Sequence, residues 1–154
     1  MNIRDMLSEH SILVDFNASS KKHILDALSK LAEKELEINY RVILESLTKR
    51  EKLGSTGVGN GIAIPHATEK SLNKPKGFLA ILSNGLEFNS NDDQPVDIIF
   101  LLLAPSNNGS EHLQALAAVS RFLRNPELIT KLRGCKTIQS VLALISQTIQ
   151  DQAA

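Results

Sequence analysis

Residues 50–67 read REKLGSTGVGNGIAIPHA, and this stretch organises the rest of the chain. It begins with the cation Arg50, and near its end His66 directly follows Pro65. Four of the eight residues between positions 54 and 61 are glycines: Gly54, Gly57, Gly59 and Gly61. Glycine permits positive φ and close approach of the backbone to a ligand. Pro65 fixes its own φ and makes Ile64 extended, so we expect a short, stiff strand over 62–65 that presents His66 beside an amide-rich loop, as in an anion-handling site.

Length and composition narrow the classes of protein. A chain of 154 residues with zero net charge fits one globular domain, and the balanced charge argues against a nucleic-acid partner. Cys135 has no second cysteine to pair with, which is compatible with a reducing cytoplasm. The N-terminus carries charges and no apolar core, so we expect no signal peptide. The apolar run over 98–104 is far below the ~20 residues of a membrane span, so we expect no membrane insertion.

The N-terminal part of the sequence has mainly helical periodicity. The pattern predicts a strand over 12–14 and helices over 2–7, from Ser19 or Ser20 to about Leu36, and from Tyr40 to about Lys52. In the last of these helices the apolar stripe is Ile43, Leu47 and then Arg50. The spacing i, i+4, i+7 therefore predicts that Arg50 points toward the body of the domain.

The middle of the sequence predicts strands and the end predicts helices. Beyond 62–65, strands are expected over 77–83 and over 96–103, with Asn84-Gly85 as a turn between them. Helices are expected over about 111–124, 127–133 and 137–149, followed by a frayed tail from Asp151. This order predicts a single α/β domain with a mixed sheet of about five strands and helices on both faces.

Two nucleotide-binding patterns fail in the glycine-rich loop. Residues 54–59 have the spacing of a Walker motif, but residues 60–61 are Asn and Gly where a lysine and a hydroxyl residue are required. The dinucleotide pattern fails because the loop follows a predicted helix instead of a strand. Two interpretations of this segment remain. The loop could offer its amides and the hydroxyls of Ser55 and Thr56 to a transient phosphate, or it could be a plain connection between helix and strand.

His66 is the candidate nucleophile. The ordinary pKa of a histidine, about 6.5, leaves most of an imidazole neutral near pH 7, with one nucleophilic nitrogen. Such a ring can accept a phosphoryl group without an activating base. The alternative is a structural histidine at the end of a strand. The glycine loop and Pro65 give the two interpretations equal weight.

His112 and Arg50 are the candidate stabilising groups. Ser110 or Asn108 would cap the helix of His112, which puts His112 in a first turn where free amides attract anions. His112 also heads the stripe Leu116, Val119 and Leu123, so it faces inward; spacing alone favours a histidine packed under a loop. Arg50 could equally be a cation that a helix C-terminus favours. His10 and His23 are interpreted as structural, and His66 with His112 makes too few ligands for a metal.

A long motif gives the chain a family resemblance. Residues 47–66, LTKREKLGSTGVGNGIAIPH, together with QPVD at 94–97 and SEHL at 110–113, resemble the type-2 IIA domains of the bacterial phosphotransferase system, the mannitol and fructose class. Within that class the similarity is to the nitrogen-regulatory branch. The resemblance covers essentially the whole chain and implies one domain over 3–150.

The resemblance assigns roles to the candidate residues. It implies that His66 is the phosphorylated histidine, reacting through Nε2 with a phosphohistidine on an HPr-like (NPr) carrier in a phosphoenolpyruvate-driven relay. It implies that His112 is the second active-site histidine, that Arg50 is the motif arginine, and that the sheet is mixed and five-stranded. A transient phosphoryl group, with no resident cofactor, would be the only group that the site carries. Regulatory proteins, among them potassium transport or sensor proteins, would read its state.

Three other interpretations stay open. A sugar-specific IIA subunit would pass its phosphate to a separate IIB partner, although the continuous match from Arg50 to His66 favours the nitrogen branch. A binding module would use His66 only as a structural residue. A metal-assisted hydrolase is disfavoured by the small number of ligands.

Overall fold

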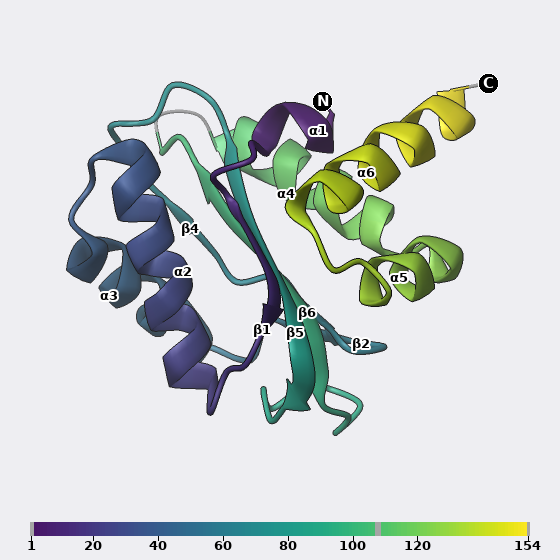
Figure 1. The fold of residues 1–154 in the computed structure, drawn as a ribbon. Helices are drawn as coiled ribbons and strands as arrows, with labels where there is room; N and C mark the ends of the chain where they lie inside the picture. Colours follow the sequence, from purple (N-terminus) through teal and green to yellow (C-terminus); the bar gives the residue numbers. More distant parts are fainter. Residues whose placement is uncertain (1, 107–108, 154) are drawn as a thin grey trace.

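A computed structural model describes residues 2–106 and 109–153, and one sheet between two layers of helices forms the molecule (Figure 1). The strands are β1 (Ile12–Phe16), β2 (Gly57–Gly59), β3 (Ile62–Ala63), β4 (His66–Thr68), β5 (Lys76–Leu86) and β6 (Val96–Ala104). The helices are α1 (Ile3–Met6), α2 (Lys21–Leu36), α3 (Tyr40–Lys52), α4 (Gly109–Leu123), α5 (Pro126–Arg133) and α6 (Ile138–Ala153).

β6 is the central strand of this sheet. It pairs antiparallel with β5 and parallel with both β3 and β4, and the sheet order is β1-β5-β6-β3-β2. Every residue of β6 is buried except the half-buried Asp97, as expected for an apolar run covered on both faces. The mixed sheet is confirmed, but it has six strands, not five, because β2 and β4 were not recognised in the sequence.

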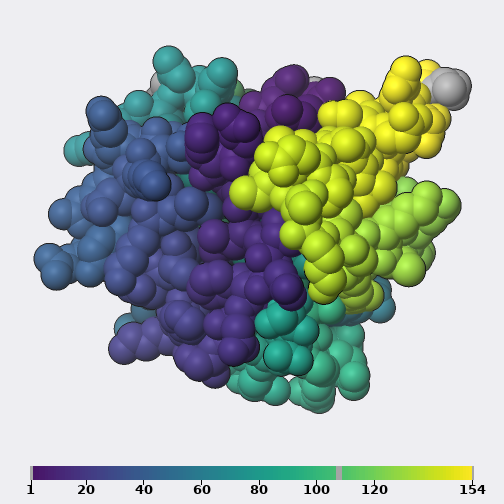
Figure 2. All heavy atoms as spheres, in the orientation of Figure 1, coloured from purple at the N-terminus to yellow at the C-terminus, as the bar shows by residue number. Residues whose placement is uncertain are grey.

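Alternate side chains of β6 enter two separate cores. Ile98, Phe100 and Leu102 pack in the core under α1, α4, α5 and α6. Ile99, Leu101 and Leu103 pack in the core under α2 and α3. Figure 1 shows the two helix layers on opposite faces, and in Figure 2 the N-terminal segment that includes β1 lies between them. The prediction of helices on both faces is confirmed.

The helices α2 and α3 begin at the predicted capping residues. The Ser20 side chain accepts a hydrogen bond from the His23 amide, and the Asn39 side chain accepts one from the Arg41 amide. α4 begins at Gly109, so Ser110 lies within its first turn and does not cap it, contrary to one of the two predicted caps. Asn108, the other predicted cap, lies outside the described residues.

Two further predictions of local structure were wrong. Asn84-Gly85 is not a turn, because β5 continues through both residues to Leu86. The ladder with β6 is irregular there, and a Cβ on Gly85 would lie 2.9 Å from the Pro95 Cβ, so the glycine makes room for the returning chain. The tail is also not frayed from Asp151: α6 extends to Ala153, and the Gln147 side-chain amide donates to Asp151 Oδ1 at 2.8 Å.

The central position of β6 predicts a large effect of Leu101→Ala. Leu101 has no exposed surface, and truncating a fully buried leucine costs about 3 kcal/mol of unfolding free energy. The change should lower the urea midpoint without changing the slope of the transition. Val42→Ala is the control, because Val42 is 50% exposed on α3. Equal losses of stability in both variants would contradict the central role of β6.

Candidate functional site

His66 begins β4 at the edge of β6. Its Cα pairs with Leu102, and the preceding carbonyl of Pro65 accepts a hydrogen bond from the Leu102 amide at 2.9 Å. The His66 Nδ1 lies 2.8 Å from the carbonyl oxygen of Ile64. A carbonyl only accepts, so Nδ1 carries the hydrogen and the neutral ring keeps its lone pair on Nε2. The backbone thus fixes both the orientation and the tautomer of the ring.

The surroundings of His66 keep the ring neutral. Burial is the main cause that lowers the pKa of His66, and the positive charge of Arg50 lowers it further. The hydrogen bond to Ile64 and the negative charge of Glu51 raise the pKa, but they are outweighed. At neutral pH, Nε2 is therefore available as a nucleophile.

His112 lies against His66 from the first turn of α4. The two ring centroids are 5.5 Å apart and the rings meet edge to face. Burial, followed by the proximity of His66, lowers the pKa of His112. Its Nε2 is buried and has no hydrogen-bond partner within the described part of the chain. A buried polar atom without a partner is unfavourable, so an oxyanion beside His66 would gain a hydrogen bond there.

Arg50 reaches the site from the end of α3. Ile43 and Leu47 of the predicted stripe are buried, whereas Arg50 is half-buried at its end. The Arg50 Nη1 donates to the carbonyl oxygen of Gly54 at 2.8 Å. After burial, its positive charge is a further cause that lowers the pKa of His66, and the same charge would favour a negative group on that ring.

Only the first part of the glycine loop lies beside His66. The Thr56 carbonyl accepts a hydrogen bond from the Ile64 amide at 3.0 Å, and β2 then pairs antiparallel with β3. The pairing thus begins at Thr56, and Gly54 is linked to the site through its carbonyl, which accepts from Arg50 Nη1. Ser55 Oγ donates to the Phe88 carbonyl oxygen at 2.6 Å, so this hydroxyl is engaged with the β5–β6 connection.

Gly57, Gly59 and Gly61 lie in or next to the β2–β3 hairpin, away from His66. Ile62 pairs with Ile98 whereas His66 pairs with Leu102, so the hairpin end is about 13 Å from His66 along β6 at roughly 3.3 Å per residue. Gly59 and Gly61 have φ values of +98° and +81°, which only glycine adopts easily. The structure brings Arg50, His66 and His112 together and ties Gly54 to Arg50. Gly57, in β2, pairs with Ala63, and Gly59 and Gly61 flank Asn60 at the hairpin turn.

Glu51 and Lys21 are residues near the site that the sequence did not single out. The Glu51 carboxylate accepts hydrogen bonds from the amide and the hydroxyl of Thr56, at 3.1 and 2.5 Å. Lys21 Nζ, on α2, lies 3.0 Å from Glu51 Oε1. The only signal in the sequence was the position of Glu51 between Arg50 and the loop, because Lys21 is distant along the chain.

Two kinds of feature, a metal-binding cluster and a membrane-spanning helix, are absent from residues 2–106 and 109–153. They contain no cluster of three histidine, cysteine, aspartate or glutamate side chains that could hold a metal ion. No described helix is both long enough and apolar enough to cross a membrane.

The geometry of His66 predicts a measurable tautomer and titration. Long-range ¹H–¹⁵N spectra at neutral pH should show Nδ1 protonated and Nε2 unprotonated, with a titration midpoint below the ordinary histidine pKa of about 6.5. Because the folded-state pKa is lowered, protonation favours the unfolded chain, and His66 should reduce stability progressively as the pH falls below about 6.5. A midpoint above about 6.5, or a proton on Nε2, would contradict this geometry.

Comparison with known proteins identifies the family. A family model described as "Phosphoenolpyruvate-dependent sugar phosphotransferase system, EIIA 2" matches residues 5–148. A nitrogen regulatory protein of Bradyrhizobium diazoefficiens is 40% identical over 146 residues, which cover 95% of each chain. One of Escherichia coli K12 is 36% identical over 86% of this chain and 82% of its own. The crystal structure of IIA-Ntr from Neisseria meningitidis superposes with a TM-score of 0.86 at 31% identity, covering 93% of this chain and 98% of that one. The resemblance in the motif is thereby confirmed, and the chain belongs to the EIIA 2 family of the phosphoenolpyruvate-dependent phosphotransferase system.

Proposed function

We propose that this protein is a phosphohistidine carrier whose acceptor is His66 Nε2. The observation that carries the proposal is the hydrogen bond from Nδ1 to the Ile64 carbonyl oxygen, which leaves Nε2 unprotonated in a neutral ring. The donor would be a phosphohistidine on an HPr-like (NPr) carrier, within a relay that starts from phosphoenolpyruvate. This relay runs in the cytoplasm, where we expect the protein to act.

The transfer needs little covalent chemistry from the protein. The lone pair of His66 Nε2 forms the bond to phosphorus, the bond from phosphorus to the donor imidazole breaks, and its electron pair stays on the donor ring. The proton on His66 Nδ1 remains where the Ile64 carbonyl holds it. Arg50 and His112 would stabilise the phosphoryl oxygens, since phosphoryl transfer depends on positioning and charge stabilisation. Neither a metal nor a resident cofactor takes part in this step.

A regulatory role is favoured over sugar transport. The relatives with 40% and 36% identity over 95% and 86% of this chain are named nitrogen regulatory proteins, whereas a fructose-specific EIIA component of Haloferax volcanii with 36% identity aligns over only 70% of it. Phosphorylation would add nearly two negative charges to a half-buried site whose two histidines are neutral, and this change can determine which partners bind. Targets such as potassium transport or sensor proteins belong to the proposal through family resemblance alone. Onward transfer from His66 to a sugar-specific IIB protein would instead indicate the sugar branch.

The roles of the three side chains predict three different kinetic defects. His66→Ala should abolish acceptance from a pre-phosphorylated carrier. His112→Ala should accept phosphate but pass it on poorly, because onward transfer needs the oxygens held in line. Arg50→Ala should slow both directions about 100-fold, the effect of losing a charge-assisted contact of about 3 kcal/mol. Time-resolved intact mass and peptide mapping measure all three. Phosphate on His112 in the unmutated protein, or acceptance by His66→Ala, would overturn the assignment.

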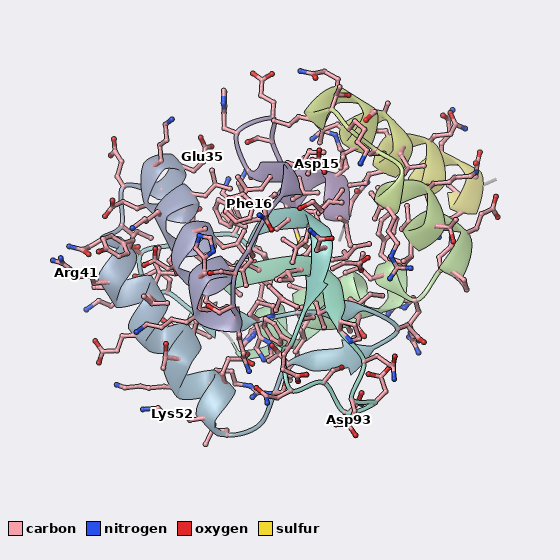
Figure 3. The ribbon with its side chains drawn as sticks, turned by 60° about the horizontal axis from the view of Figure 1, so that its bottom comes forward. Asp15, Phe16, Glu35, Arg41, Lys52 and Asp93 are labelled. Atoms are coloured by element: carbon pink, nitrogen blue, oxygen red, sulfur yellow. The ribbon has the colours of Figure 1, made fainter. Side chains whose placement is uncertain are left out.

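Two exposed leucines beside the site predict where the carrier docks. Leu53 is 84% exposed next to Gly54, and Leu113 is 68% exposed next to His112. A carrier whose histidine reaches His66 would cover both. Figure 3 shows Lys52, the residue before Leu53, at the surface where α3 ends. Leu53→Asp and Leu113→Asp should each raise the KM for the phosphorylated carrier about tenfold, because apolar anchors dominate interface energies.

Two controls separate docking from chemistry in this experiment. Val42→Asp is the matched control, because Val42 is 50% exposed near the start of α3, at the other end from Leu53. It should leave the KM unchanged. Phosphorylation of His66 by phosphoramidate, a small donor, should proceed at the same rate in every variant. An equal effect of Val42→Asp on the KM would contradict docking on this surface.

A further inference from the structure

We propose that Glu51 is a positioning residue that sets the orientation and tautomer of His66 through Thr56 and Ile64, with Lys21 as its counter-ion. Its effect on phosphoryl transfer rests on the proposed function of His66, but its effect on the ring does not. Membership of the family does not by itself assign a role to either charged residue. The proposal rests on a continuous series of contacts from α2 to the imidazole.

The series begins with an ion pair whose carboxylate is buried and whose ammonium is half-buried. The side chain of Glu51 is 7% exposed and that of Lys21 is 21% exposed, and their charged atoms lie 3.0 Å apart. The carboxylate also accepts two hydrogen bonds from Thr56, one from its amide and one from its hydroxyl. A buried carboxylate is tolerated only when its charge and lone pairs are satisfied in this way. Thr56 is thus held at two points by a group that cannot easily turn elsewhere.

Two backbone hydrogen bonds continue the series to His66. The Thr56 carbonyl accepts from the Ile64 amide at 3.0 Å, and the Ile64 carbonyl accepts from His66 Nδ1 at 2.8 Å. Ile64 is 3% exposed and precedes Pro65, so its peptide group has little freedom. Displacement of Thr56 would tilt the Ile64 carbonyl away from Nδ1. The ring would then lose the bond that keeps the hydrogen off Nε2.

The loop has a second attachment that does not depend on Glu51. Ser55 Oγ donates to the Phe88 carbonyl oxygen at 2.6 Å. Lys21 stacks over the Phe88 ring, with Nζ 4.5 Å from the ring centroid. Loss of the Glu51 side chain therefore releases Thr56 while the loop stays attached to the β5–β6 connection. The ring can in this way be disturbed without unfolding the domain.

Glu51 also acts on His66 through its charge, and substitutions separate the two effects. Its negative charge raises the pKa of His66, opposite to the effect of Arg50. Glu51→Gln keeps an oxygen that can accept from Thr56 but removes the charge. Glu51→Ala removes both the accepting oxygen and the charge. Glu45→Gln is the matched control, because Glu45 is 70% exposed on the same helix and is also paired with a lysine, Lys49.

The test measures His66 directly in the unphosphorylated protein. Long-range ¹H–¹⁵N spectra of Glu51→Ala should show a substantial population of the tautomer with the proton on Nε2. Glu51→Gln should keep the Nδ1 proton but lower the titration midpoint. Glu45→Gln should change neither property. An unchanged His66 tautomer in folded Glu51→Ala would overturn the proposal.

Transfer kinetics provide the second measurement. With phosphorylated carrier, Glu51→Ala should lower kcat at least about tenfold and leave KM within about twofold, because a misplaced nucleophile slows the reaction without weakening docking. Glu51→Gln should recover most of the lost kcat, and full loss in Glu51→Gln would overturn a positional role. If Glu51→Ala does not fold, Thr56→Val, which removes only the hydroxyl contact, takes its place with the same expected shift in tautomer. If the unmutated protein accepts no phosphate, the proposed function fails while the spectra still decide the role of Glu51.

Discussion

Burial of β6 on both faces is the constraint on which the rest of the structure depends. Its side chains point alternately into two cores, so the sheet is stable only with helices on each side. Its edges must also be satisfied, and β5, β3 and β4 supply the partners. The candidate site follows from this arrangement. β4 pairs near the carboxyl end of β6, α4 follows that end, and the two elements bring His66 and His112 against one another.

Both histidines of the site are neutral, and a cation lies beside them. Burial lowers the pKa of both histidines, so neither ring repels the other and His66 keeps its nucleophilic lone pair. Arg50 supplies one cation, and its Nη1 is held by the Gly54 carbonyl. The Glu51–Lys21 pair lies behind the loop and adds no net charge. Neutral rings cost less free energy to bury than charged ones. Within the described residues the site still has a cation and an unpartnered ring nitrogen, two groups suited to the proposed phosphoryl group.

The sequence predicted those features that local chemistry determines. Helical periodicity located α2 and α3, and the apolar run located β6. The family resemblance, not the spacing, implied that His66 and His112 share a site, and their rings lie 5.5 Å apart. The missed features depend on tertiary pairing. β2 and β4 are three residues each, too short for a periodic pattern, and they exist because β6 and β3 offer them edges. The prediction of a turn at Asn84-Gly85 was wrong because β5 continues through an irregularity there and pairs again with β6 at Leu86. The contribution of Glu51 could not be seen without Lys21 from another helix.

The pairing of β4 with β6 determines when, during synthesis and folding, the two histidines can come together. His66 and Leu102 are register partners although 36 positions separate them (102 − 66), and β1 pairs with β5 over an even longer interval. Contacts of such long separation form late in folding, because the intervening chain must first be ordered. On the ribosome, β3 and β4 emerge before the strand that supports them, and α4 emerges later still. A nascent or partly folded chain therefore lacks the paired histidines, and the proposed acceptance of phosphate by His66 requires the folded domain.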